Sequence, residues 1–145
     1  MIYYSRKLDE TDLEMIQAFL LEIDLVKIEK NKLLSYMEQA EEKSYKIGIF
    51  NENQDLIGLA GLIEDSDTNY WDFKFFIIKK DQRNQGLGKK VYDDLEEWMV
   101  DLGCQKVTVV LDKDYYSSLS FFSQLKFKIE SQNSDSTLMF RIPIS

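Results

Sequence analysis

The sequence predicts an α/β fold built around a mixed sheet, and three consecutive segments carry that prediction. Residues 71–79 are rich in aromatic and aliphatic side chains and indicate a strand. Residues 88–102 place apolar side chains at helical spacing, and residues 107–111 form a short apolar strand. A strand, a helix and a second strand in this order predict a parallel pair joined by a right-handed crossover.

Within these segments the pattern gives sharper expectations. The helix should end at Gly103 and bury one apolar stripe. That stripe comprises Val91, Leu95, Trp98, Met99 and Leu102. The strand at 107–111 has the composition of a strand that is buried on both faces.

The flanking segments complete the predicted fold. Thr11 or Asp12 is expected to cap the first helix, and Gly58 and Gly61 indicate a bulge or a close backbone approach inside a strand. The other expected elements are strands at 2–7, 45–50 and 56–64, a helix at about 31–42, a polar turn at 51–55, a helix at about 115–125, and strands at 127–131 and 137–142. We expect a single domain over residues 1–145, in the order β-α-α-β-β-β-α-β-α-β-β.

Composition excludes several classes of function. The chain has 145 residues, no histidine and one cysteine, so it offers neither a zinc site nor a histidine-based triad. Any general base must be a carboxylate, a tyrosine, a lysine or a water chain. A net charge of −8 argues against nucleic acid as a partner. No apolar run approaches the ~20 residues that span a membrane, and without an export signal the expected location is cytoplasmic.

The turn between the strand at 71–79 and the following helix is the strongest functional signal. Residues 74–90 contain six cations and one anion, Asp81, in a chain of net charge −8. Lys89 and Lys90 stand in the first helical turn, where the helix dipole disfavours cations unless an anion binds there. A Gly-containing turn at a helix N-terminus also presents backbone N–H groups to phosphate. The pattern predicts a site for a polyanionic small molecule.

The acidic residues are concentrated in the other half of the chain. Residues 1–70 contain fifteen acids and seven bases, whereas residues 71–145 contain eleven of each. This excess is typical of a solvated face, and it also suits a cationic substrate. The excess includes Glu22, Asp24, Glu29 and Glu38, which lie in the helical region between about residues 21 and 40.

The element order, the chain length and the turn Arg83-Asn84-Gln85-Gly86-Leu87-Gly88 together resemble the GNAT superfamily of acyl-CoA-dependent N-acyltransferases. The resemblance covers essentially the whole chain, including Leu125-Lys126-Phe127, where the family usually has Leu-Gly-Phe. Other phosphate motifs fit worse. A Rossmann fingerprint needs a glycine near Val91, and a P-loop needs Gly-Lys-Ser/Thr at a different spacing.

The resemblance implies a mostly antiparallel sheet whose central parallel pair splays apart to bind CoA. It implies acetyl-CoA as acyl donor, with the pyrophosphate on backbone N–H groups and pantetheine along the preceding strand. The implied cofactor-binding residues are Phe76, Ile77, Ile78, Arg83, Asn84, Gln85, Gly86, Leu87, Gly88, Lys89 and Phe122. No metal is implied.

The implied reaction is direct attack of a primary amine on the thioester in a ternary complex. In several members of the superfamily a strand carboxylate eleven residues before the signature acts as base, and that position is Asp72 here. A solvated aspartate at a strand entrance is an equal alternative. Glu64 and Asp65 are further candidates, although a polar turn explains them better. Cys104 is expected to be a small buried hydrophobe rather than a nucleophile.

The general acid departs from the family pattern. Many members carry a tyrosine in the last helix, where this chain has Phe122, which can pack against the cofactor but cannot donate a proton. Tyr115 or Tyr116 is the substitute donor, with aromatic core filling as the simpler role for each. The departure keeps open a second function, an acyl-CoA-binding sensor with weak turnover. The expected partners are a small-molecule or peptide amine, in a monomer or homodimer.

Overall fold

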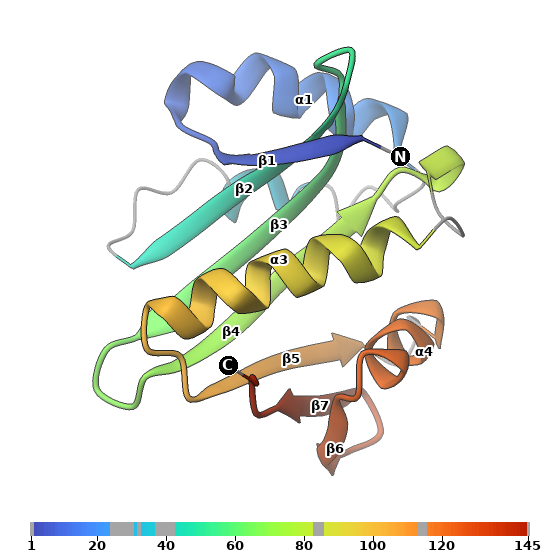
Figure 1. Cartoon of the computed structure of the whole chain (residues 1–145). Helices are drawn as coiled ribbons and strands as arrows, with labels where there is room; N and C mark the ends of the chain where they lie inside the picture. The colour runs from blue at the N-terminus through green and yellow to red at the C-terminus, as the bar shows by residue number, and fades with distance from the viewer. Residues whose placement is uncertain are drawn as a thin grey trace. The chain divides into compact units, whose positions relative to one another are not determined.

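The computed structural model describes residues 2–23, 31, 33–36, 43–82, 86–112 and 116–144. In that part of the chain, hydrogen bonding orders the strands of one mixed sheet as β1-β2-β3-β4-β5-β7-β6 (Figure 1). The strands are β1 (Tyr3–Lys7), β2 (Ser44–Asn51), β3 (Leu56–Asp65), β4 (Tyr70–Ile78), β5 (Lys106–Asp112), β6 (Lys128–Gln132) and β7 (Ser136–Arg141). The helices are α1 (Leu13–Glu22), α3 (Leu87–Asp101) and α4 (Tyr116–Gln124), with 3₁₀ turns at Glu10–Asp12 and Lys80–Gln82.

The predicted fold class is confirmed. β4 and β5 are parallel, whereas β1–β2, β5–β7 and β6–β7 are antiparallel. The parallel register runs from Tyr70 opposite Lys106 to Phe73 opposite Val109 and ends there, while β4 continues to Ile78. The chain divides into two compact units, Met1–Leu62 with Phe75–Val91 and Ile63–Lys74 with Tyr92–Ser145.

In the first unit, α1 packs on β2 and β3. Its buried side chains Ile16, Phe19 and Leu20 join Phe50 and Leu59 in one cluster. The predicted close backbone approach is confirmed at Gly58, whereas at Gly61 the close neighbour is a side chain. An added Cβ on Gly58 would lie 2.9 Å from the Ile77 carbonyl oxygen, and one on Gly61 would lie 2.4 Å from the Phe75 ring.

The first helix begins differently from the prediction. Neither Thr11 nor Asp12 caps α1 through its side chain. Asp9 accepts a hydrogen bond from the Thr11 N–H, and the Asp12 carboxylate accepts one from the Asp9 N–H, which forms a capping box around the 3₁₀ turn. Of the helix predicted at about 31–42, residues 31 and 33–36 are helical, and residues 32 and 37–42 lie outside the described part of the chain.

In the second unit, the inner faces of β4, β5 and β7 pack against the later turns of α3. Trp71 contacts Trp98 edge-on, and Phe73 contacts Tyr92. Two sequence expectations are wrong here. Val110 is 56% exposed, so β5 alternates rather than being buried on both faces, and Leu102 is 48% exposed beyond the end of α3.

Both later helices end at a residue in the left-handed conformation, but the two residues differ. After α3, Gly103 has a φ of +91°, the Cys104 N–H bonds the Met99 carbonyl and the helix ends as predicted. After α4, the left-handed position is taken by Lys126, with a φ of +71°. The Phe127 N–H bonds the Phe122 carbonyl there. A lysine thus occupies a conformation that favours glycine.

Across the described residues, we find no helix whose length and apolar character would let it cross a membrane.

Candidate functional site

The described residues between the end of β4 and the start of α3 form local backbone turns. The Lys79 N–H bonds the Ile57 carbonyl, and the Gln82 N–H bonds the Lys79 carbonyl in the 3₁₀ turn. Gly86 has a φ of +75°, which non-glycine residues rarely adopt. Arg83, Asn84 and Gln85, three of the predicted binding residues, lie outside the described part of the chain.

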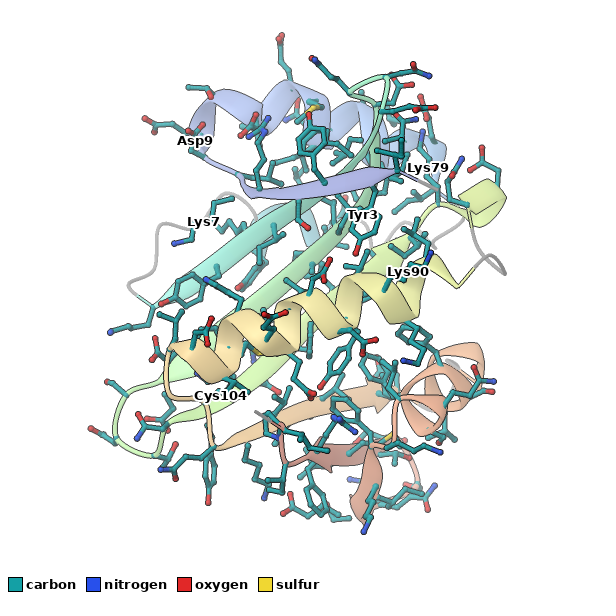
Figure 2. The ribbon with its side chains drawn as sticks, viewed as in Figure 1. Tyr3, Lys7, Asp9, Lys79, Lys90 and Cys104 are labelled. Carbon is teal, nitrogen blue, oxygen red and sulfur yellow. The ribbon has the colours of Figure 1, made fainter. Side chains whose placement is uncertain are left out.

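The start of α3 has the features of an anion-binding helix terminus. The Lys90 N–H bonds the Gly86 carbonyl, so the first helical hydrogen bond closes over Gly86. Leu87 is buried and anchors the turn, and the exposed side chains that follow it are Lys89 and Lys90, the latter labelled in Figure 2. The first turn contains no acidic residue. Its backbone dipoles and cations therefore both favour a bound anion.

Among the described cations of this region, Lys74 and Lys79 are ion-paired with carboxylates. The Lys79 ammonium lies 2.5 Å from Glu22 at the end of α1, and the Lys74 ammonium lies 2.8 Å from Asp72. Lys79 also lies 5.8 Å from the centre of the Phe19 ring. The cationic excess counted from the sequence is therefore partly neutralised by fixed neighbours. Glu22 is one of the four acids suggested for a cationic substrate. Asp24, Glu29 and Glu38 lie outside the described residues.

The strand residues predicted to contact pantetheine lie at the end of β4. Phe76 and Ile77 are half-buried and Ile78 is buried. Ile78 packs directly against the backbone of Gly58. A side chain at Gly58 would not fit, because its Cβ would lie 2.8 Å from Ile78 Cδ1. This end of β4 lies beyond the parallel register with β5.

Asp72, the predicted base, is held by two neighbours on the same sheet. Thr108 stands opposite it in the parallel register and donates its hydroxyl proton to Asp72 Oδ1 at 2.8 Å. Lys74, two residues along β4, lies 2.8 Å from Asp72 Oδ2. Sequence reasoning missed both partners. The available signal was a lone hydroxyl residue, Thr108, within an otherwise apolar strand.

The alternative bases differ in their surroundings. Asp65 forms the turn after β3, where its carboxylate accepts the Asp67 N–H at 3.0 Å, as the polar-turn interpretation expects. Glu64 is half-buried at the end of β3.

The candidate proton donors are placed only in part. Phe122 is 3% exposed and packs against the rings of Phe73, Phe121 and Phe127. Tyr115 lies outside the described residues, as does the side chain of Tyr116. Cys104 is buried, and burial raises the pKa of its thiol to about 11, which fits the expected structural role.

A buried polar cluster on α3 and β7 was not predicted. Tyr92 donates its hydroxyl proton to Glu96 at 2.6 Å, and the Arg141 guanidinium donates to both carboxylate oxygens of Glu96. Arg141 also donates to the Leu125 carbonyl at 3.0 Å. Burial and the neighbouring Glu96 raise the pKa of Tyr92. Because each polar group has a partner, the cluster fixes packing within the second unit.

A protein-family model matches most of the chain. Residues 13–127 match the model of the Acetyltransferase (GNAT) family. No curated protein matches the sequence.

Solved structures share the fold at low sequence identity. The PaiA N-acetyltransferase of Thermoplasma acidophilum, solved with coenzyme A, superposes with a TM-score of 0.79 at 20% identity, covering 98% of this chain and 99% of that one. A GNAT-family acetyltransferase of Staphylococcus aureus gives 0.79 at 17% identity, covering 99% and 100%. The dodecameric spermidine N-acetyltransferase of Vibrio cholerae gives 0.76 at 14% identity, covering 97% and 94%.

Proposed function

The chain belongs to the Acetyltransferase (GNAT) family, and we propose that it transfers an acetyl group from acetyl-CoA to a primary amine. The observation that supports the proposal most directly is the start of α3. Gly86, just before the helix, has a φ of +75°, and the first helical turn contains no acidic residue. Such a turn binds phosphate through backbone N–H groups and the helix dipole. A CoA-bound structure with the same fold supports CoA as the anion.

The proposed cofactor contacts follow the chain along this segment. Backbone from Arg83 to Lys89 takes the pyrophosphate, with Gly86 and Gly88 allowing close approach. Backbone of β4 from Phe76 to Ile78 takes the pantetheine arm, and Phe122 supports the cofactor by packing. No metal takes part in this scheme.

Asp72 is the proposed base. The amine must lose a proton before it attacks the thioester carbonyl, and a carboxylate accepts that proton directly or through water. Thr108 and Lys74 fix the position of the Asp72 carboxylate. A thiol has an ordinary pKa of about 8.5, so the departing thiolate is a fairly stable leaving group. Turnover therefore does not require a strong general acid. Tyr115 is the proposed donor where one is used.

The proposed acceptor is a cationic small-molecule or peptide amine, in a cytoplasmic protein that is a monomer or homodimer. The acidic excess of residues 1–70 supports a cationic acceptor. A spermidine N-acetyltransferase shares the fold. Glu22 contributes less to this charge than the sequence suggests, because it pairs with Lys79.

Calorimetric titration with acetyl-CoA, desulfo-CoA and ATP tests the cofactor. We expect micromolar binding of both CoA compounds, and a loss of at least about tenfold in Gly86→Asp, because the new anion repels phosphate at the helix terminus. Gly86→Asn is the matched control, since asparagine has the same size and tolerates a positive φ. Equal affinity in the two variants, or no CoA binding to the wild type, contradicts the proposal.

Release of CoA over a panel of amines tests catalysis. Asp72→Asn should lower kcat by about 100-fold, because the base is removed while the shape of the side chain is kept. Acetyl-CoA affinity should stay unchanged in that variant. An unchanged kcat would remove Asp72 from the mechanism.

A second candidate function is an acyl-CoA-binding sensor. The observation that favours it is the position of Phe122, which is buried among aromatic rings. A phenylalanine side chain has no proton to donate, so it cannot act as the general acid. Tight acetyl-CoA binding without CoA release, across cationic and neutral amines, would support the sensor over the enzyme.

A further inference from the structure

Lys74 places an amine directly on the proposed base. Along β4, Trp71 and Phe73 are buried, whereas Asp72 is half-buried and Lys74 is exposed, so the latter two share one face of the strand. The Lys74 ammonium lies 2.8 Å from Asp72 Oδ2, and its side chain is 44% exposed. A substrate ammonium awaiting deprotonation would need the same contact.

We propose that Lys74 is itself an acyl acceptor, so that the protein acetylates its own β4 strand. This inference rests on the proposed function, because acetyl-CoA is the acyl donor and Asp72 the base. The Lys74 position adjoins the strand segment proposed for pantetheine, since Phe76 follows only two residues later, about 7 Å along an extended strand.

The chemistry balances with Lys74, Asp72, acetyl-CoA and solvent water. Asp72 takes one proton from the Lys74 ammonium, and the free Nζ attacks the carbonyl carbon of the acetyl thioester. A new N–C amide bond forms as the C–S bond breaks. Loss of the thiolate leaves a second proton on the amide nitrogen, and that proton passes to the thiolate, directly or through water. Asp72 releases the first proton to solvent, so the products are acetyl-lysine, CoA and one proton.

Two other lysines are ion-paired with carboxylates that are not proposed as the base. Lys79 pairs with Glu22, and Lys106 pairs with Glu130 while lying 5.0 Å from the Phe140 ring and 5.3 Å from the Tyr70 ring. Lys106 is also less accessible, at 17% exposure against 44% for Lys74. Among these three lysines, only Lys74 contacts the proposed base.

Acetylation changes the charge around the base. Before acetylation, the positive charge of Lys74 balances the negative charge of Asp72. Acetyl-lysine is neutral, so the modified protein presents an unbalanced Asp72 carboxylate. A cationic amine would then bind Asp72 without displacing a lysine. Acetylation of Lys74 should therefore lower KM for cationic acceptors more than for neutral ones.

The test is incubation of the purified full chain with acetyl-CoA, followed by intact mass and peptide mapping. We expect one acetyl group at Lys74. The rate of modification should saturate as the acetyl-CoA concentration rises. The fraction of chains modified per unit time should not depend on protein concentration, because the reaction occurs within one molecule. Exposed Lys128 on β6 serves as the internal reference for uncatalysed acylation. Asp72→Asn should slow modification of Lys74 by about 100-fold and leave Lys128 unchanged.

Lys74→Arg is the second variant, because it keeps a cation beside Asp72 and removes the acceptor nitrogen. It should bind acetyl-CoA normally and gain no acetyl group above the Lys128 background. If the wild type binds acetyl-CoA and releases CoA with added amines, yet modifies Lys74 no faster than Lys128, the inference fails and the proposed function stands. If acetyl-CoA does not bind, both fail.

Discussion

Arg141 on β7 and Glu96 on α3 form a two-point ion pair inside the second unit. Arg141 Nε lies 2.5 Å from Glu96 Oε1, and Nη2 lies 3.0 Å from Oε2. Glu96 also accepts the Tyr92 hydroxyl proton, so both carboxylate oxygens are satisfied at a buried position. Sequence patterns do not predict this pair, because its two residues are 45 positions apart.

Removing one member of this pair should be costly. Arg141→Met leaves the Glu96 carboxylate buried without its cationic partner, and we expect a loss of about 3–5 kcal/mol in the free energy of unfolding. Urea denaturation measures it. The double variant Arg141→Met with Glu96→Gln should lose less than the two single variants summed, because it leaves no buried unpaired charge. Strict additivity would show that the two residues do not interact.

The same pair should make stability depend on pH. Burial alone raises the pKa of Glu96, but hydrogen bonds from Arg141 and Tyr92 outweigh it and bring that pKa below its ordinary value of 4.5. Its contribution is therefore fully present above pH 4.5 and is lost as the pH falls through the folded-state pKa. The stability difference between wild type and Glu96→Gln should stay constant at neutral pH and shrink below that value. A difference that grows on acidification would contradict the pairing.

Gly61 should not tolerate even one added carbon. A Cβ there would lie 2.4 Å from the Phe75 ring, which Tyr36 holds edge-on at 5.3 Å between ring centres. We expect Gly61→Ala to reduce the free energy of unfolding by about 1–3 kcal/mol, because the ring must move within a packed cluster. Thermal or urea unfolding checks the value. Phe75→Leu should recover part of the loss when added to Gly61→Ala, and no recovery would place the strain elsewhere.

Lys126 should be replaceable with a gain in stability. Its φ of +71° after α4 costs a side-chain-bearing residue about 1 kcal/mol relative to glycine. We therefore expect Lys126→Gly to raise the free energy of unfolding by about 0.5–1 kcal/mol in urea titration. Lys128→Gly is the matched control. It also removes an exposed lysine, but from the extended strand β6, where glycine should destabilise.

Cys104, labelled in Figure 2, should be inert in the native state. Burial raises the pKa of its thiol to about 11, so at pH 8 roughly one thiol in a thousand is ionised. Reaction with Ellman's reagent should be slow at pH 8, accelerate as the pH approaches 11, and become fast on unfolding. A fast native reaction at pH 8 would show that the thiol is exposed or activated.

Sequence patterns predicted the order of elements because each strand and helix carries a local signature. They failed where the outcome depends on distant neighbours. Leu102 continues the apolar stripe but falls after α3 has ended, and Val110 belongs to an apolar run yet is exposed. Asp9, Thr11 and Asp12 can all cap a helix, and only backbone geometry selects Asp9.

The candidate site shows the same limit. The glycine turn is a local sequence pattern, and Asp72 was predicted from its position relative to that turn in the family that the chain resembles. Thr108 could not be assigned to Asp72 because strand register, rather than any nearby pattern, brings the two together. The lysine beside the base is two residues away in sequence, yet only side-chain geometry shows that it contacts Asp72.

The ion pair between Glu96 and Arg141 also constrains the order of events during synthesis. The ribosome makes Arg141 45 residues after Glu96, an interval of about 2–9 s at ~5–20 residues per second. Until then, docking of α3 would bury a carboxylate without its guanidinium. We therefore expect the nascent second unit to close only after β7 has been made.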